Sequence, residues 1–581
     1  FSDRYLADIL GTEEEKVREL RFVVGLHPHY RAVDTCAAEF EAITPYLYST
    51  YQNCWLPNPV PTEQAPALAP ENKTVMILGG GPNRIGQGIE FDYCCVHGAM
   101  ALRERGYKVV MINCNPETVS TDFDVSSRLY FEPVTTESVL EIARMEKPLG
   151  AIVQFGGQTP LKISHALEKG GLPILGTSVN AIDQAEDRDR CQELATHLGL
   201  KQPENGTANS VEEAVKLAAK LGYPVLVRPS YVLGGQAMKI AYTEKSFRQF
   251  AEIALQVSDG RSLFVDRFLR DADEVDVDVL CDGEDTVVGG VMEHIEEAGI
   301  HSGDSSSAIP CFSLAPSTVD RIRRAACELA LAFKVKGLMN AQFAVQNDEI
   351  YLIEVNPRAS RTVPFVSKAV GKPLAKIAAQ VMLGAKLEEF DLPQALDENL
   401  DLYHVKGAVF PFNRFDKTDT ILGPEMRSTG EVMGRAPTFG AAFAKALLGN
   451  QMKLPRKGKV FVSVRDEDKN AVLGVCRDLQ WHGMEIHATK GTHAFLSQHN
   501  VRSTEARKYQ EGSPNCVDML KNREFVLVVN TTSDEKAVED SYMIRRTSLE
   551  SKVPCLTTIS EAIALLKALE SKEEDLEVAP L

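Results

Sequence analysis

The spacing of apolar and polar residues changes character along the chain. Residues 1–55 show helical spacing without strand alternation, and Thr12 and Glu15 have the spacing of a helix capping box. From Lys73, short β-rich runs alternate with helical stretches in the order βαβαβ, which predicts a parallel sheet with helices on its faces. A third α/β unit begins at Lys457, with strands expected in KVFVSV, MEIHAT and FVLVVN.

A second α/β region lies between these two units. It is expected to open with a helix at about 188–198 and to become more helical up to about Gly449. Its predicted strands are at 225–228, 263–268, 274–281, 286–293, 341–346 and 350–355. Residues 56–70 contain five prolines in fifteen positions, which predicts an extended linker.

Composition excludes several classes of protein. The 581 residues suggest about three or four domains. Lys+Arg 63 against Asp+Glu 81 gives a net charge of −18, which argues against binding to nucleic acid or to an anionic membrane. No apolar run reaches the roughly 18–20 residues of a membrane span. Twelve cysteines without a CxxC pair predict reduced thiols and a cytoplasmic location, and the first residue, Phe1, predicts a fragment or a processed product.

The most specific chemical pattern is a predicted β-hairpin around Asn347-Asp348. With a three-residue loop, Gln342 lies opposite Glu354, and Asn356 shares their face. A two-residue loop would separate Gln342 from Glu354. One carboxylate and two amide oxygens are hard ligands that suit Mg²⁺ ions bridging ATP phosphates. The alternative is an ordinary solvated hairpin face.

Basic residues and glycines surround this hairpin in the sequence. Arg358 and Arg361 follow it directly, and Arg228 ends a predicted strand before the glycine pair 234–235. Guanidinium groups bind phosphate, and the glycines suit a mobile lid, although each feature is also compatible with an ordinary surface. The glycine-rich turn at 79–88 fails both the dinucleotide fingerprint and the P-loop pattern, which disfavours an NAD enzyme. It is either an anion loop or a plain tight turn.

Five longer runs resemble the large subunit of carbamoyl phosphate synthetase, and they align with its C-terminal half. They are residues 228–235, 292–296, 299–304, 342–358 and 423–434. The resemblance covers essentially the whole chain and implies a multidomain α/β fold. The implied domains are the end of a helical oligomerisation domain (1–55), a Pro-rich linker (56–70), a pre-ATP-grasp α/β domain (71–187), an ATP-grasp domain with a helical C-terminal part (188–450) and a methylglyoxal-synthase-like parallel α/β allosteric domain (457–581).

In that family the second ATP-grasp unit phosphorylates carbamate with ATP, in the synthesis of carbamoyl phosphate for arginine and pyrimidine biosynthesis. The resemblance implies two Mg²⁺ or Mn²⁺ ions on Gln342, Glu354 and Asn356, with Arg358 and Arg361 beside the γ-phosphate and carbamate. The implied nucleotide contacts also include Arg188, Arg228, Arg267, Leu269, Glu274, Gly299, Ile300, His301 and Ser302. The implied K⁺ contacts are Glu274, His294 and Ser305.

The C-terminal unit carries hydroxyl and amide groups where two of its predicted strands end. Such strand ends bind ligands in open α/β sheets, and these groups suit a phosphate, although they are equally typical of helix caps. With the lysines that match the family, the implied nucleotide-monophosphate contacts are Lys469, Thr489, Thr492, Lys508, Asn530 and Thr532. Members activated by ornithine carry glutamate and tyrosine at the positions of Gly407 and Cys555. The chain retains Glu296, Asp304 and Thr557 but lacks those two residues, which argues against ornithine regulation.

The resemblance also implies partners. They are a glutaminase small subunit that supplies ammonia, the N-terminal half that phosphorylates bicarbonate, and further copies in an oligomer. Two alternatives remain open: another ATP-grasp carboxylate ligase of the biotin-carboxylase kind, and a nucleotide-binding regulatory half without turnover. Retention of Glu354 and Asn356 argues against the regulatory alternative.

Overall fold

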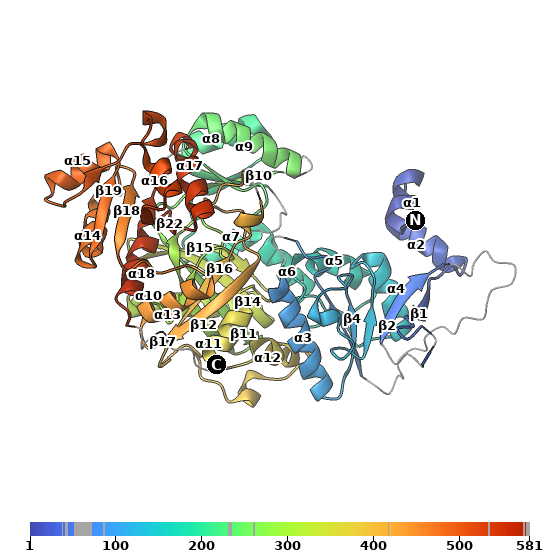
Figure 1. The fold of residues 1–581 in the computed structure, drawn as a ribbon. Coiled ribbons are helices and arrows are strands. Elements are labelled where there is room, and N and C mark those ends of the chain that lie inside the picture. Colours follow the sequence, from blue (N-terminus) through green and yellow to red (C-terminus); the bar gives the residue numbers. More distant parts are fainter. Residues whose placement is uncertain are drawn as a thin grey trace.

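The computed structural model describes residues 1–581 except 38, 41–44, 52–72, 85–87, 230–234, 259–261, 416, 533–534, 573–575 and 577–581. The predicted linker at 56–70 and most of the glycine lid at 230–235 lie outside the described residues. Figure 1 shows a first unit in blue and cyan on one side, a C-terminal unit in orange and red on the other, and a central unit between them. Within the described residues, no helix is long and apolar enough to cross a membrane, and every cysteine is a free thiol.

The first unit is built on a six-stranded sheet with the order β1-β2-β5-β4-β3-β6. Its strands are β1 (His29–Ala32), β2 (Tyr46–Thr50), β3 (Thr74–Leu78), β4 (Lys108–Ile112), β5 (Arg128–Tyr130) and β6 (Ala151–Ile152). From β2 to β6 neighbouring strands pair in parallel, and β3 is buried along its whole length, as expected for a sheet covered on both faces. The connecting helices are α3 (Ile89–Glu104), α4 (Thr136–Glu146) and α5 (Gln158–Lys169). The five predicted elements, β3, α3, β4, α4 and β6, are present in that order, but strand β5 between β4 and α4 was not predicted.

Residues 1–55 differ from the sequence prediction. Helices α1 (Asp3–Leu10) and α2 (Glu14–Val23) are present, but β1 and β2 follow them and extend the first sheet. The prediction of a segment without strands was therefore wrong. Tyr46–Thr50 is a short run of aromatic and hydroxyl residues that becomes a strand by pairing with β1 on one side and β5 on the other. The predicted capping box was also wrong, since the N-cap of α2 is Glu13 without a side-chain cap bond.

The central unit contains a four-stranded and a seven-stranded sheet. The smaller sheet has the order β7-β10-β8-β9, and helices α8 (Val211–Leu221) and α9 (Glu244–Val257) pack on it. Its strands are β7 (Asn205–Ala208), β8 (Val225–Pro229), β9 (Lys239–Ala241) and β10 (Leu263–Arg267).

The larger sheet is antiparallel, with the order β15-β14-β11-β12-β13-β16-β17. Its strands are β11 (Asp273–Asp282), β12 (Thr286–Glu297), β13 (Ser307–Ile309), β14 (Lys336–Gln346), β15 (Glu349–Asn356), β16 (Tyr403–Val409) and β17 (Gly430–Ala436). The helices around it are α10 (Pro316–Ala332), α11 (Val363–Val370), α12 (Leu374–Met382) and α13 (Phe439–Gly449). All six strands that the sequence predicts between 225 and 355 are present.

The two faces of β11 differ in character. Val275, Val277 and Val279 belong to a buried apolar cluster that includes residues of α10. The alternate positions, Asp276 and Asp278, are also buried but polar. Side chains of a strand alternate between its faces, so one face of this sheet carries the core and the other carries a polar layer. The candidate site lies on that polar face.

The C-terminal unit has a parallel five-stranded sheet with the order β20-β19-β18-β21-β22, which confirms the predicted third α/β unit. Its strands are β18 (Gly458–Ser463), β19 (Met484–Ala488), β20 (Thr504–Glu505), β21 (Phe525–Asn530) and β22 (Cys555–Leu556). Its helices are α14 (Lys469–Trp481), α15 (Lys490–Gln498), α16 (Cys516–Lys521), α17 (Glu535–Ser551) and α18 (Ile559–Leu569). Helix α18 packs on α13, and the fully buried Arg545 of α17 bonds to Asp419 of the central unit.

Candidate functional site

The hairpin β14–β15 places three polar side chains on one face by an unexpected route. Its loop has two residues, Asn347 and Asp348, both with positive φ (53° and 63°). A β-bulge at Ile353 then inserts one extra residue, so that Gln342 lies opposite Glu354. The predicted three-residue loop was wrong, but the predicted pair is confirmed because the bulge supplies the residue that the loop lacks.

Glu354 is exposed, whereas Gln342 and Asn356 are partly buried. Asn356 Nδ2 donates to Glu354 Oε1 (2.8 Å), and Gln342 Nε2 donates to Asp276 Oδ1 (3.0 Å). The second bond leaves Gln342 Oε1 available to a cation. Within the described residues, no group of three or more His, Cys, Asp or Glu side chains is arranged to hold a metal. A divalent ion here would therefore depend on the two amide oxygens together with Glu354, a donor set that suits Mg²⁺.

The loop after β15 carries the two predicted arginines. Arg358 donates to Ala359 O and to Asn356 Oδ1 (both 2.9 Å), and Arg361 contacts Met426 Sδ. Both guanidinium groups lie over the ring of Phe91 in α3, at 5.5 and 6.0 Å from its centroid. Burial lowers the pKa of Arg358, and burial together with the charge of Arg358 lowers that of Arg361 to about 10. Cations that are incompletely compensated in this way favour an anionic ligand.

Arg188 and Arg228 meet although they are far apart in the sequence. Arg188 opens helix α7 (Arg188–His197), and Arg228 belongs to β8. Both pair with Asp266 of β10, and Arg228 Nε lies 3.1 Å from its Oδ2. Both also lie over the ring of Phe264, at 5.0 and 5.8 Å. Burial, and then the charge of Arg228, lower the pKa of Arg188 to about 9, so two arginines share one carboxylate here.

Sequence reasoning missed Asp266 and Phe264. Phe264 lies directly opposite Arg228 in the β10–β8 register, and Asp266 follows two residues later on the same strand. The alternation in Leu263–Arg267 therefore contained a usable signal, but only once β10 was known to pair with β8.

The predicted adenosine contacts converge around the turn after β12. Glu274 Oε2 accepts from Gly299 N (3.3 Å), and a Cβ on Gly299 would meet the Phe268 ring at 2.4 Å, so only glycine fits there. Ile300 lies in the same turn. His301 Nδ1 accepts from Gly303 N (3.0 Å), and Ser302 O accepts from Lys406 Nζ (2.8 Å). Burial and Arg361 lower the pKa of His301 far enough to keep it neutral. Arg267 and Leu269 flank Phe268, and Arg267 is exposed, 3.5 Å from Glu204.

The three residues predicted to bind a monovalent cation, Glu274, His294 and Ser305, are all buried. His294 Nε2 lies 2.8 Å from Asp276 Oδ2, while its Nδ1 and Ser305 Oγ are buried without a hydrogen-bond partner. Burial raises the pKa of Glu274 to about 7. A buried hydroxyl without a hydrogen-bond partner and a buried carboxyl are oxygen ligands of the kind that K⁺ accepts, whereas His294 is already engaged with Asp276.

The buried acids of β11 also escaped sequence reasoning. Asp276 and Asp278 are each about 1% exposed and lie opposite Gln342 and Asn340 of β14. Burial opposes the charge on Asp276, but hydrogen bonding and the charge of His294 outweigh it and lower the pKa of Asp276. The signal in the sequence was a carboxylate at three alternate positions, 274, 276 and 278, with valines between them.

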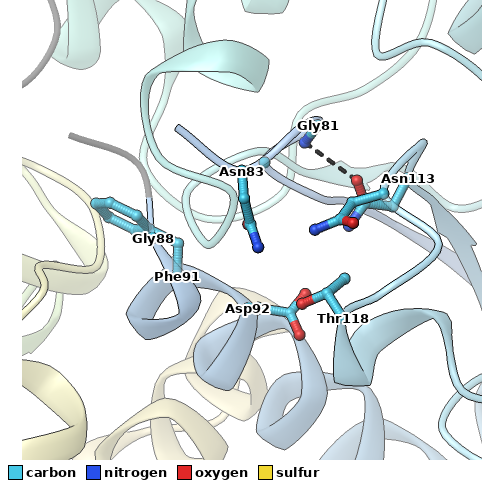
Figure 2. Close-up of a pocket in the computed structure, with 9 residues that line it drawn as sticks. Gly81, Asn83, Gly88, Phe91, Asp92, Asn113 and Thr118 are labelled. Atoms are coloured by element: carbon cyan, nitrogen blue, oxygen red, sulfur yellow. Dashed lines mark hydrogen bonds between the residues drawn. The ribbon is translucent and has the colours of Figure 1, made fainter. Parts of the chain in front are cut away.

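The glycine-rich turn after β3 forms part of a polar pocket at the ends of β3 and β4 (Figure 2). Gly81 N donates to Asn113 Oδ1 (3.1 Å), and a Cβ on Gly79 would meet the Asn113 side chain at 2.6 Å. The pocket is lined by Gly80, Gly81, Asn83, Gly88, Phe91, Asp92, Asn113, Asn115 and Thr118. The carboxylate of Asp92 disfavours a simple anion cradle. Phe91 joins this pocket to the loop that carries Arg358.

The C-terminal unit brings together most of its predicted ligand contacts. Thr489 is the N-cap of α15, and its Oγ1 lies 3.3 Å from Thr492 Oγ1. Asn530 Nδ2 donates to Ser463 O (3.3 Å), and its Oδ1 is buried without a partner. Lys469 Nζ lies 3.6 Å from where a Cβ on Gly491 would stand, which places it beside the start of α15. The remaining two predicted contacts are Thr532, just after β21, and the exposed Lys508, just before a short 3₁₀ turn.

Three family models match successive parts of the chain. They are the carbamoyl phosphate synthase preATP-grasp domain at 71–184, the carbamoyl-phosphate synthase L chain ATP binding domain at 187–390, and the MGS-like domain at 471–557. The first two correspond to the first and central units described above, and the third to the C-terminal unit.

The chain is also similar to whole proteins. It is 53% identical over 98% of its length to the carbamoyl phosphate synthase large chain of Pseudomonas syringae pv. tomato and 53% identical over 100% to that of Myxococcus xanthus. It covers 52% and 53% of these proteins, so it spans about half the length of the curated relatives it matches. Among solved structures, the biotin carboxylase domain of Hydrogenobacter thermophilus 2-oxoglutarate carboxylase, in complex with MgADP and bicarbonate, superimposes with a TM-score of 0.52 at 17% identity. That match covers 65% of this chain and 89% of the other and shows a shared fold alone.

Proposed function

The chain belongs to the carbamoyl phosphate synthase large-chain family, and from this premise we propose that it phosphorylates carbamate with ATP to give carbamoyl phosphate and ADP. The observation that carries the proposal is the hairpin face of Gln342, Glu354 and Asn356, with Arg358 bonded to Asn356 beside it. Metal-binding oxygens and phosphate-binding guanidinium groups adjoin there, as phosphoryl transfer requires.

The reaction needs alignment and charge neutralisation more than covalent chemistry. A carbamate oxygen attacks the γ-phosphorus in line, a new O–P bond forms, and the bond to ADP breaks with its electron pair leaving on ADP. Arg358 and Arg361 would hold the oxygens of the transferring group, and Phe91 beneath them would exclude water from that side. Mg²⁺ or Mn²⁺ held by Gln342, Glu354 and Asn356 would supply further charge neutralisation when bound.

The remaining nucleotide contacts follow from the same geometry. Arg188 and Arg228, which share Asp266, would hold the α- and β-phosphates. The adenosine would lie against the β12 turn, with contacts from Arg267, Leu269, Glu274, Gly299, Ile300, His301 and Ser302. The buried hydroxyl of Ser305, with Glu274 and His294, would complete a K⁺ site.

The site also implies what must act with it. Carbamate has to be supplied by bicarbonate phosphorylation and ammonia, so we propose a bicarbonate-phosphorylating N-terminal half and a glutaminase small subunit as partners in an oligomer. The reaction would take place in the cytoplasm and would serve arginine and pyrimidine biosynthesis.

The test is the reverse reaction, synthesis of ATP from carbamoyl phosphate and ADP. Glu354→Gln should abolish it, because the carboxylate that lies opposite Gln342 and beside Asn356 is lost. Glu349→Gln is the matched control: it lies on the same strand, is more than half exposed, and bonds only to Lys201 among its recorded contacts. Full reverse activity in Glu354→Gln would contradict the proposal. Nucleotide binding by the unaltered chain without any ATP formation would instead favour a regulatory half.

We further propose that the C-terminal unit binds a nucleoside monophosphate such as UMP or IMP. Thr489 and Thr492 at the start of α15, Lys469 beside it and the unpartnered Asn530 Oδ1 offer groups that suit a phosphate and a ribose. Titration calorimetry with each nucleotide tests this, with Asn530→Ala expected to abolish binding. The absence of heat above dilution for the unaltered chain would count against it.

A further inference from the structure

A buried carboxylate beneath the site fastens the arginine loop to the sheet. Asp278 of β11 is about 1% exposed, and neither oxygen faces solvent. Its Oδ1 accepts from Ser360 Oγ (2.7 Å), and its Oδ2 accepts from Thr362 Oγ1 (2.6 Å). The two hydroxyl oxygens are themselves only 2.6 Å apart. The Asp278 carboxylate therefore accepts hydrogen bonds from both hydroxyls of one short loop.

That loop is the one that carries the phosphate-binding arginines. Arg361 lies between Ser360 and Thr362 in the sequence, and Arg358 lies just before them. The loop is also tied to the first unit, where Ala359 N donates to Gln154 O (3.0 Å), and Arg361 contacts Met426 Sδ. The positions of the two guanidinium groups therefore depend on a few bonds, and two of these, from Ser360 and Thr362, end on Asp278.

The same carboxylate is linked to the metal-binding face. Asn340 Nδ2 donates both to Asp278 Oδ1 (3.1 Å) and to Asp276 Oδ1 (3.2 Å). Asp276 Oδ1 in turn accepts from Gln342 Nε2 (3.0 Å), the bond that leaves Gln342 Oε1 free for a cation. A continuous chain of hydrogen bonds thus runs from the arginine loop, through β11, to the amide of Gln342.

A buried carboxylate at position 278 is not needed for the stability of the sheet. Burying a carboxylate costs several kcal/mol unless it is well compensated, and apolar residues of similar volume would stabilise the sheet at least as well. What charge-assisted bonds supply is fixed geometry, because each holds its donor in one orientation. Catalytic groups must lie within about 0.5 Å of their productive positions.

We propose that Asp278 is a positioning residue for phosphoryl transfer. Its carboxylate fixes Ser360 and Thr362, so that Arg358 and Arg361 face the γ-phosphate, and through Asn340 and Asp276 it sets the orientation of Gln342. The role rests on the proposed function for the identity of the acceptor, but its action on the γ-phosphate does not depend on carbamate. The α- and β-phosphates, which Arg188 and Arg228 would hold, should be indifferent to it.

The decisive experiment compares two substitutions at one position in the full chain. Thr362→Val keeps the shape of the side chain but removes the hydroxyl, whereas Thr362→Ser keeps the hydroxyl. In the synthesis of ATP from carbamoyl phosphate and ADP, we expect Thr362→Val to lower kcat about tenfold and to leave the KM for ADP unchanged. The kcat of Thr362→Ser should remain within about twofold of that of the unaltered chain. Asp278→Asn should lower kcat about a hundredfold, because both ties are weakened together.

Calorimetry supplies a readout that needs no turnover. With Mg²⁺ present, the unaltered chain should bind the ATP analogue AMP-PNP more tightly than ADP, and Thr362→Val should lose that preference while it keeps its affinity for ADP. If the unaltered chain makes no ATP from carbamoyl phosphate, the proposed function fails. The loss of the AMP-PNP preference in Thr362→Val would still support the positioning role.

The matched control is Asp282→Asn, on the same strand. Asp282 is also buried, but it accepts only from the backbone N–H groups of Glu284, Asp285 and Leu387, away from the arginine loop. It should lower stability and leave kcat unchanged. The proposal is overturned if Thr362→Val keeps full kcat, if Thr362→Ser is equally impaired, or if affinity for ADP falls in step with kcat. Should Asp278→Asn fail to fold, the Thr362 pair decides alone.

Discussion

Two arginines, one in the first unit and one in the central unit, show how differently a guanidinium can be held in one protein. Arg21 of α2 is buried and donates to Asp3 Oδ1 (2.7 Å), Asp3 Oδ2 (2.8 Å) and Glu141 Oε1 (2.7 Å). Burial opposes its charge, but the hydrogen bonds to these two carboxylates outweigh burial and raise the pKa of Arg21. Arg358 is only partly buried, its two recorded hydrogen bonds go to neutral oxygens, and its pKa is lowered.

The difference indicates that Arg21 stabilises the fold, whereas Arg358 is arranged to bind an anionic ligand. Arg21 has its anions inside the protein, so α1, α2 and α4 are joined by a closed set of charges. Arg358 has only part of its compensation, and its Nε is buried without a partner. A phosphate oxygen that reached Arg358 would supply what Glu141 supplies to Arg21. The identity of their partners therefore distinguishes the two residues.

The largest expected effect is on catalysis. Arg358→Met should lower the rate of ATP synthesis from carbamoyl phosphate and ADP by about 10²–10³-fold, because a preorganised cation is lost from the transferring group. Stability to urea should not fall, since no carboxylate loses its only partner. The rate and the urea midpoint, measured on the same preparation, test the expected loss of activity and the expected unchanged stability. An unchanged rate would remove Arg358 from the site.

The opposite pattern is expected for the structural arginine. Arg21→Met should cost about 3–5 kcal/mol of stability to urea, because Asp3 and Glu141 are left buried without their shared cation. The turnover of the molecules that remain folded should not change. Asp3→Asn in the Arg21→Met background should recover part of the loss, and if it does not, uncompensated charge is not the cause.

The buried carboxyl of Glu274 should make the stability of the protein depend on pH. Burial raises the pKa of Glu274 from 4.5 to about 7, so between these values the folded chain holds a proton that the unfolded chain releases. This group therefore makes stability fall as pH rises through that window. Melting temperatures from pH 5 to 8 should show a shallower fall in Glu274→Gln than in the unaltered chain. Added K⁺ should stabilise the unaltered chain more above pH 7 than below it, because K⁺ competes with the proton.

The smallest expected effect on stability is that of removing an exposed ion pair. Lys201 Nζ lies 2.7 Å from Glu349 Oε2, as close as the bonds of Arg21, but both side chains are more than half exposed. Solvent screens such a pair, so Lys201→Met should leave the urea midpoint unchanged within error. A loss comparable with that of Arg21→Met would show that partner distance, rather than burial, governs these ion pairs.

The sequence carried the central features of the fold because its periodicities are local. Alternation located β11, β12, β14 and β15 of the larger central sheet but not β13, β16 and β17, and the βαβαβ order located β3, β4 and β6 of the first sheet. Strands β1, β2 and β5 were not found, because each is short and β2 joins the rest of the sheet by pairing with β5, which lies about eighty residues further along the chain. Long-range pairing of this kind leaves little trace in a single sequence.

For the candidate site too, the sequence predicted some features and missed others that depend on residues far away in the chain. Gln342 and Glu354 were predicted to be opposite each other through a loop length that proved wrong, and the bulge at Ile353 restored the result. The resemblance named Arg188 and Arg228, but not the Asp266 that they share. Asp278 was not singled out, because its importance comes from Ser360 and Thr362, some eighty residues away, rather than from any neighbour in the sequence.

The bulge at Ile353 also restricts how this hairpin can evolve. Deleting that single residue would turn Glu354 and Asn356 to the opposite face of the sheet while every strand remained in place. A lineage could tolerate many substitutions in the hairpin, but a change of length would have to be matched by a second one between the turn and the acid. Gaps in aligned descendants of this sequence should therefore occur in compensating pairs here, or accompany loss of the acidic side chain altogether.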